Sequence, residues 1–247
     1  MTLLLISFII KVLFQFYALV GFANLLMLKF VNLIDQRQIT MQFKSLFIAL
    51  FCFIGVHAQE GKRNSAYAIG LSYGNGSEFK NTDYTYTNRY IQAQVYYTFN
   101  PLKKWQYQMA LQPEVNFARH RLKNFYFVKP EDPDFEDKRE AYMKLMDIKE
   151  YIFNVALFVR YKCSNDLSIY IMGSVGPMIT DTETERLTKG FAFCDVFGMG
   201  TTYNLGDVAI DVRVCARHVS NAGLQSENAG FNTKNIAFGI IVPLECF

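Results

Sequence analysis

Short segments in which apolar and polar residues alternate at every second position fill the chain after residue 58. In the clearest segment, 90–99, the odd positions are apolar and most even ones polar: Ile91, Ala93, Val95, Tyr97 and Phe99 against Gln92, Gln94, Tyr96 and Thr98. Alternation at period two is typical of a β-strand with one apolar and one polar face. No run after residue 58 is long and apolar enough for a membrane-spanning helix. The chain is therefore expected to be built from strands.

The pattern predicts eight strands, at 65–74, 88–99, 104–118, 150–162, 167–178, 188–203, 207–217 and 233–246. Their connections alternate between tight turns at 100–103, 164–166 and 204–206 and longer polar loops at 75–87, 119–149, 179–187 and 218–232. Pro113 interrupts the third strand and predicts a bulge there. Strands of this number and length are typical of an all-β fold, an eight-stranded antiparallel transmembrane β-barrel with long extracellular loops and short periplasmic turns.

A soluble β-sandwich or lipocalin-like barrel would show similar alternation with its apolar face turned inward, and periodicity alone does not separate inside from outside. Three features favour the membrane barrel. Aromatic residues gather near strand ends, a secretion signal precedes the strands, and the aromatic Phe247 ends the last strand. Closure of the barrel is required because unpaired backbone groups cannot face lipid. We therefore expect the protein in the bacterial cell outer membrane.

The first 58 residues form a leader with two apolar blocks. The second block, 41–58, has a basic residue at Lys44, an apolar run and small-residue positions ending at Ala58, which is the layout of a signal peptide. Translation from Met41 would make 1–40 an over-extended start, whereas a genuine membrane anchor at 12–34 is the alternative. The mature barrel is expected to span 59–247. Four basic residues and one acidic residue of the leader carry the whole formal charge of +3, so a nucleic-acid partner is not expected.

Few residues of the mature chain suit common catalytic patterns, and its only histidines are His120 and His218. Cys-x-x-Cys, His-Glu-x-x-His and phosphate-binding Gly-x-x-x-x-Gly-Lys motifs are absent from the sequence, so neither a cofactor nor a metal is expected. A dense polar segment at 217–232 remains, where the seventh strand meets the last long loop. This segment is the strongest candidate for chemistry.

Residue parity gives the segment a direction. Apolar residues of the seventh strand have even numbers, so His218 and Ser220 are expected on the lipid-facing side. A histidine base and a serine hydroxyl two residues apart on one face can come within hydrogen-bonding range, which activates the serine as a nucleophile. The side-chain amide of Asn228 and the backbone N–H near Gly223 are candidate donors to an oxyanion.

A longer string strengthens this interpretation: His218-x-Ser220-Asn221-Ala222-Gly223, followed by Asn228-x-Gly230. It resembles the active-site segment of the outer-membrane lipid A 3-O-deacylases, the PagL family. The resemblance covers the last two strands and their loop, and the rest of the chain by architecture alone. It implies an esterase that removes a fatty-acyl chain from the lipid A of lipopolysaccharide. His218 would be its general base, Ser220 its nucleophile, and Asn228 with the Gly223 N–H its oxyanion donors.

One position departs from the family pattern. The acidic third member should fall two residues after the glycine that matches Gly230, where this sequence has Asn232. An amide can orient an imidazole but cannot offset imidazolium charge as a carboxylate does. Glu227 is the nearest acidic substitute. The alternatives are a working Ser/His pair with an amide orienter, a barrel that keeps the segment without its rate, and a non-enzymatic barrel for adhesion or envelope integrity.

Three further polar groups carry weaker expectations. A basic group at the base of the longest loop either contacts lipid A phosphates or, as is commoner at a barrel rim, is simply solvated: His120, Arg119, Arg121 and Lys123. The acidic run at 131–137 is more consistent with a solvated loop than with a cation site. Inward-pointing charges are expected to plug the barrel: Glu114, Arg160, Asp211 and Arg213. Four cysteines permit disulfides or free thiols in the envelope: Cys163, Cys194, Cys215 and Cys246. Whether the barrel forms a homodimer stays open.

Overall fold

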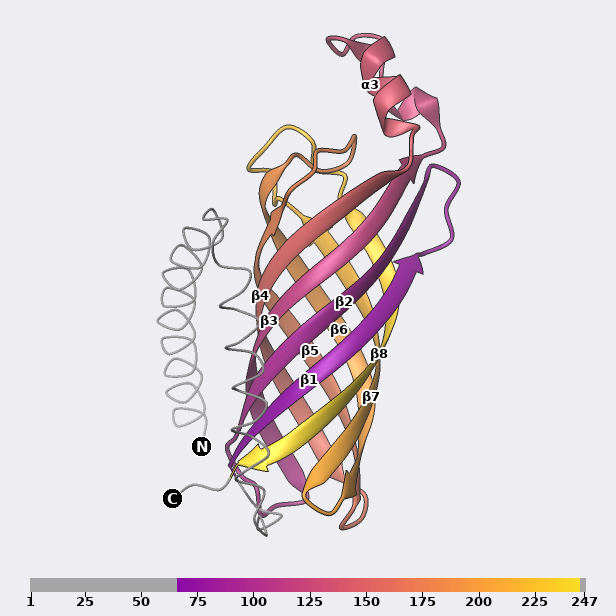
Figure 1. Ribbon diagram of the computed structural model, residues 1–247. Coiled ribbons are helices and arrows are strands. Elements are labelled where there is room, and N and C mark those ends of the chain that lie inside the picture. The colour runs from indigo at the N-terminus through magenta and orange to yellow at the C-terminus, as the bar shows by residue number, and fades with distance from the viewer. Residues whose placement is uncertain (1–65, 245–247) are drawn as a thin grey trace, which may run out of the picture. The chain divides into compact units, whose positions relative to one another are not determined.

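A computed structural model describes residues 66–244, which form a closed antiparallel barrel in the order β1 to β8 (Figure 1). The strands are β1 (Tyr67–Glu78), β2 (Tyr84–Thr98), β3 (Trp105–Leu122), β4 (Met146–Lys162), β5 (Leu167–Thr180), β6 (Gly190–Leu205), β7 (Val208–Ser220) and β8 (Phe231–Leu244). Pairing of β1 with β8 closes the barrel. The predicted eight-stranded fold is confirmed. The predicted leader at 1–58, with Cys246 and Phe247, lies outside the described residues.

The two faces of the barrel wall differ in polarity. Along β2, the inward Gln92 and Gln94 are 5% and 1% exposed, whereas the outward Ile91 and Val95 are about half exposed, at 50% and 49%. A soluble barrel would show the opposite arrangement, with its apolar face inside. The apolar outer wall fits a hydrocarbon environment, so the structure supports the transmembrane alternative over the soluble one.

The strands extend further at the loop end than the sequence pattern predicts. The loop expected at 75–87 is reduced to 79–83, because β1 and β2 continue pairing up to Ser77 and Thr87. Outward positions there become polar, as at Asn75 and Arg89, so apolar alternation fades although the hydrogen-bonded ladder continues. The alternation of apolar and polar residues therefore indicates only the lipid-facing part of a strand, and the backbone pairing between strands continues beyond that part.

The longest connection, 123–145, contains two short helices, η1 (Phe125–Phe127) and α3 (Phe135–Tyr142). Figure 1 shows α3 beyond the end of the barrel at which the long loops gather. No helix within the described residues is long and apolar enough to cross a membrane. The acidic run predicted to be solvated falls on α3 and the loop before it.

Pro113 does not produce the predicted bulge. Gln92 pairs with Glu114 and Val95 with Leu111, so β2 and β3 have equal numbers of residues between these pairs. On the other side, Pro113 lies directly opposite Phe153 of β4 in an unbroken register. Proline removes one ladder donor without requiring an inserted residue. The bulge prediction was wrong because the strand absorbs this loss in place.

The barrel interior holds two clusters of apolar and aromatic side chains, which include Met178 and Phe158, together with buried polar and charged side chains, several of which pair with one another. Arg217 Nη2 lies 2.6 Å from Glu114 Oε1, and the Tyr170 hydroxyl donates to Asp211 Oδ1 at 2.8 Å. Arg160 Nη1 donates to Thr202 Oγ1 at 2.6 Å. The four charges predicted to plug the barrel are all buried in it: Glu114, Arg160, Asp211 and Arg213. Within the described chain, the cysteines are free thiols: Cys163, Cys194 and Cys215.

Candidate active site

The pairing of β7 with β8 brings His218 directly opposite Asn232. The two side chains are joined by a hydrogen bond of 2.8 Å between His218 Nδ1 and Asn232 Oδ1. Because the amide oxygen can only accept, Nδ1 of the ring carries the proton and Nε2 is left as the basic nitrogen. Asn232 thus selects the tautomer that a general base needs.

Two buried neighbours hold these side chains on the outer wall. Val219 and Phe231 are cross-strand partners, and each is 1% exposed inside the barrel. Phe231 also stacks on Tyr86 with ring centroids 4.4 Å apart. Since successive strand residues alternate in direction, these anchors turn His218, Ser220 and Asn232 outward. The predicted orientation of His218 and Ser220 is confirmed.

Ser220 is the last residue of β7, two positions beyond His218 on the same face. Within the described residues no hydrogen bond links its hydroxyl to the imidazole. Catalytic hydrogen bonds are commonly long in structures without substrate and shorten when substrate binds. The structure places the two side chains on the same face of one strand.

The 221–230 loop is organised around the buried side chain of Asn221. Its backbone N–H donates to Asn228 Oδ1 at 2.7 Å, and its Nδ2 donates to the Glu227 carbonyl at 2.8 Å. The Gly223 N–H donates to Asn221 Oδ1 at 3.0 Å, so this predicted oxyanion donor is engaged within the loop. The Asn228 Nδ2 group makes no hydrogen bond to the described residues and is the freer of the two predicted donors.

Gly230 joins the 221–230 loop to the 181–189 loop. Its N–H donates to the Arg186 carbonyl at 2.8 Å, and Arg186 Nε donates back to the Gly230 carbonyl at 2.7 Å. The Arg186 guanidinium lies over the Tyr84 ring at 4.4 Å. A left-handed φ of 64° at Gly230 turns the chain into β8 beside Ser220. The hydrogen bonds between the two loops therefore fix where β8 begins, and with it the position of Asn232.

Glu227, the predicted substitute acid, is bonded away from His218. Its carboxylate accepts from Thr188 Oγ1 at 3.0 Å and from Ser226 Oγ. The hydrogen bond from Ser226, together with that from Thr188, holds the pKa of the Glu227 carboxyl below its usual value. This carboxylate fastens the 221–230 loop to the 181–189 loop, and no described contact joins it to the imidazole.

An apolar groove of about 710 Å³ lies on the outer wall next to the site. Register puts it one outward row closer to the periplasm, because Phe197 and Lys234 both pair with Ala216, two residues before His218. The small side chain of Ala216 leaves the hollow between its larger neighbours. A hydrocarbon chain that lies in this groove would point from within the membrane toward the level of Ser220.

His120 is not part of this surface. It is fully buried inside the barrel, where Nε2 lies 2.9 Å from Glu185 Oε2 and Nδ1 lies 3.1 Å from the Thr85 carbonyl. Both alternatives for His120, contact with lipid A phosphates and a solvated rim position, were wrong, because strand β3 continues past it and its side chain points inward. Arg119 and Arg121, its neighbours, are exposed on the outer face.

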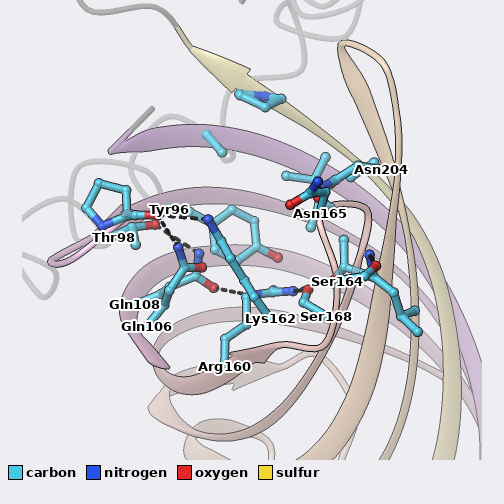
Figure 2. A pocket seen from close by; sticks show the side chains of 17 residues that line it. Tyr96, Thr98, Gln106, Gln108, Arg160, Lys162, Ser164, Asn165, Ser168 and Asn204 are labelled. Carbon is cyan, nitrogen blue, oxygen red and sulfur yellow. Dashed lines mark hydrogen bonds between the residues drawn. The ribbon is translucent and has the colours of Figure 1, made fainter. Parts of the chain in front are cut away.

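Two other features resemble functional sites but lack the arrangement that a site needs: a Gly-x-Ser-x-Gly string in β1 and a polar cavity inside the barrel. Residues 70–74 read Gly-Leu-Ser-Tyr-Gly, the letters of an esterase nucleophile turn, but they lie within β1, and Ser72 is buried against Gln94. At the periplasmic end, a polar cavity of about 400 Å³ contains Arg160 and Lys162 (Figure 2). These cations donate to Gln108 at 2.8 Å and to the Pro101 carbonyl at 2.9 Å. No histidine lines this cavity.

The model of a known protein family, described as lipid A 3-O-deacylase (PagL), matches residues 65–240. The chain belongs to this family. The matched region contains the whole 217–232 segment, and family membership together with the barrel places the protein in the outer membrane.

Several solved barrels are similar in structure. Neisserial surface protein A has 10% identity and a TM-score of 0.44, covering 73% of this chain and 98% of its own. The outer membrane enzyme PagL has 13% identity and a TM-score of 0.41, covering 71% and 99%. Ail of Yersinia pestis has 13% identity and a TM-score of 0.36, covering 72% and 98%. Comparison with curated protein sequences finds no match.

Sequence reasoning missed one residue beside the family segment. Asp195 of β6 pairs directly with His218, on the side of β7 opposite to Asn232, and its side chain is exposed on the outer wall. Motif spacing could not find it, because it lies 23 residues before the histidine. The available signal was an acidic residue in a strand whose other outward positions are uncharged.

Proposed function

We propose that this protein is an outer-membrane esterase that removes a fatty-acyl chain from lipid A, with Ser220 as nucleophile and His218 as general base. The observation that carries the proposal is the 2.8 Å hydrogen bond between His218 and Asn232. His218 lies two residues before Ser220 on the same lipid-facing side of β7. Family membership supports lipid A as the substrate class. The outward position suits an amphipathic substrate that arrives laterally through the membrane.

The proposed reaction begins when His218 Nε2 accepts the Ser220 hydroxyl proton. Ser220 Oγ then bonds to the ester carbonyl carbon, and the resulting oxyanion accepts a hydrogen bond from Asn228 Nδ2. Collapse breaks the ester C–O bond, and the imidazolium returns its proton to the departing sugar oxygen. Water activated by His218 then hydrolyses the acyl-serine, which releases a free fatty acid and restores the hydroxyl.

The groove beside Ala216 supports a role in binding the scissile acyl chain. Its walls are apolar apart from Lys234 and a few small polar groups near β1 and β8. A chain in the groove would gain contacts with Phe197 and Val214 while its ester end lies at the level of Ser220. Which acyl chain fits is decided by how far along the groove the ester is held.

The test is hydrolysis of purified lipopolysaccharide by the folded protein in detergent, followed by mass spectrometry of lipid A and measurement of free fatty acid. We expect Ser220→Ala and His218→Ala to lose at least about 10³-fold in kcat, within the range for catalytic pairs. Thr201→Ala, which removes a hydroxyl at the periplasmic end of β6, should keep the wild-type rate. Full activity in Ser220→Ala would exclude this nucleophile, and an inert wild type would favour a non-enzymatic barrel.

A further inference from the structure

The barrel fold alone does not explain why an acidic residue stands at position 195. The outward residues of β6 are otherwise uncharged: Phe191, Phe193, Phe197, Met199, Thr201, Tyr203 and Leu205. A carboxylate on a lipid-facing wall is costly, and acidic residues in membrane segments usually mark functional sites. Within the described chain, no ion pair joins Asp195 to a lysine or arginine.

The register gives this carboxylate one neighbour of opposite character. Asp195 and His218 are direct cross-strand partners, so they share a face with Cβ atoms about 4.5–5.5 Å apart. Asn232 binds the imidazole from the other side, through Nδ1. His218 therefore lies between a neutral amide that binds its ring and an acidic residue directly opposite it on the adjoining strand.

The other charged groups around His218 are few. Lys234 of β8 lies diagonally across the outer face, one row toward the periplasm. Arg217 precedes His218 on β7 but points into the barrel, where it is paired with Glu114 at 2.6 Å. The outward neighbours of Asp195 along β6 are the uncharged Phe193 and Phe197. Asp195 is thus the negative charge that faces the imidazole from the adjoining strands.

We propose that Asp195 is a positioning residue that supplies the negative charge missing at Asn232, so that two strands share the work of one triad carboxylate. This inference rests on the proposed Ser/His function. Asn232 fixes the tautomer of His218, and Asp195 stabilises the imidazolium that forms when Ser220 gives up its proton. The apolar surroundings strengthen this attraction relative to water, because fewer solvent dipoles screen the two charges.

The test compares kcat/KM against pH for Asp195→Asn and wild type on lipopolysaccharide in detergent. We expect a loss of about 10- to 100-fold, and an acidic limb of the profile displaced to lower pH by about 0.5–2 units, because removing the carboxylate destabilises the imidazolium. Asp195→Glu, which keeps the charge, should retain most activity. Asp147→Asn is the matched control, since Asp147 is also outward but pairs with Arg119 at 3.0 Å on β3.

A rescue variant separates this charge effect from structural damage. Adding Asn232→Asp to Asp195→Asn returns a carboxylate to the other side of His218, and we expect it to restore activity at least tenfold. Wild-type kcat/KM with an unmoved acidic limb in Asp195→Asn would overturn the role of Asp195, as would failure of the rescue in a folded protein. Inactive Ser220→Ala beside an active wild type would still uphold the Ser/His reaction, so the two proposals fail separately.

Discussion

His218, the proposed catalytic base, has cross-strand neighbours that lie far apart in sequence but adjacent across the barrel wall. The bond to Asn232 orients the ring, and the register with Asp195 puts a carboxylate on its other side. Both outward positions depend on residues that point the opposite way, since Val219 and Phe231 are fixed inside the barrel. At the residue scale, the site is a consequence of strand parity.

Gly230 gives a prediction at this scale. A Cβ added at Gly230 would lie 2.2 Å from the Val219 carbonyl oxygen, and its φ of 64° disfavours any side chain by about 1–2 kcal/mol. We expect Gly230→Ala to destabilise the barrel by more than that amount and to lower activity by displacing Ser220 relative to Asn232. Denaturant unfolding in detergent and fatty-acid release measure both effects.

Gly223→Ala is the matched control for this substitution. Gly223 also has a left-handed φ, 77°, but an added Cβ would meet no atom within 4 Å. Gly223→Ala should therefore lower the stability of the barrel only by the cost of a left-handed backbone in a residue with a side chain, about 1–2 kcal/mol. Equal destabilisation by the two variants would show that the contact with Val219 does not matter.

At the scale of elements, the 181–189 and 221–230 loops behave as one unit above the site. Leu187 and Asn228 form a bridge between them, and Arg186 exchanges two hydrogen bonds with Gly230. Glu227 adds a hydrogen bond from Thr188. A change in either loop is therefore transmitted to the point where β8 begins.

The carboxyl of Glu227 makes this coupling pH-dependent. Its hydrogen bonds from Ser226 and Thr188 lower its pKa in the folded state. A lowered pKa means stability that is present above the ordinary glutamate value of about 4.3 and is lost as pH falls through the folded-state pKa. We expect Glu227→Gln to be less stable than wild type by under about 1 kcal/mol at neutral pH, and the difference to vanish in acid. Denaturant titrations at several pH values measure it.

Glu140→Gln is the control for that series. The hydrogen bond from Lys144, at 2.8 Å, also lowers the pKa of the Glu140 carboxyl, but this exposed pair joins α3 only to the residues just after it. It joins no second loop, so its removal should leave the stability of the barrel unchanged at every pH. A pH-independent difference for Glu227→Gln would contradict the role of its ionised form.

The sequence predicts that the strands exist, but not where each one ends or how neighbouring strands are aligned. Alternation located all eight strands, since a lipid-facing strand must repeat at period two, and local spacing brought His218, Ser220 and Asn228 into one segment. It did not show that β3 continues to Leu122, which buries His120, because the outward residues there are polar. Asp195 was missed because its meaning depends on the register of β6 with β7, which no local pattern encodes.

At the scale of the whole molecule, the barrel has an apolar outer wall around an interior that contains both charged pairs and apolar clusters. Its interior is held by bonded charges such as Arg217 and Glu114, while its outer wall is apolar. This arrangement is consistent with the proposed lipid hydrolase site, which opens sideways on the outer wall. In the proposed function the substrate need not enter the barrel, and the packed interior behind Val219 and Phe231 supports the strands that carry the outward row of His218.

The outer wall gives the last prediction. Ile91 lies midway along β2, points outward and is 50% exposed, whereas Thr87 points outward on the same strand near the extracellular rim. We expect Ile91→Arg to reduce the free energy of folding into phospholipid vesicles by about 2–4 kcal/mol, and Thr87→Arg by about 0–1 kcal/mol, because the cost of a cation depends on depth in the bilayer. Equilibrium folding with denaturant measures both. Equal costs at the two positions would contradict a lipid-facing β2, since the same charge in water would be tolerated equally at either depth.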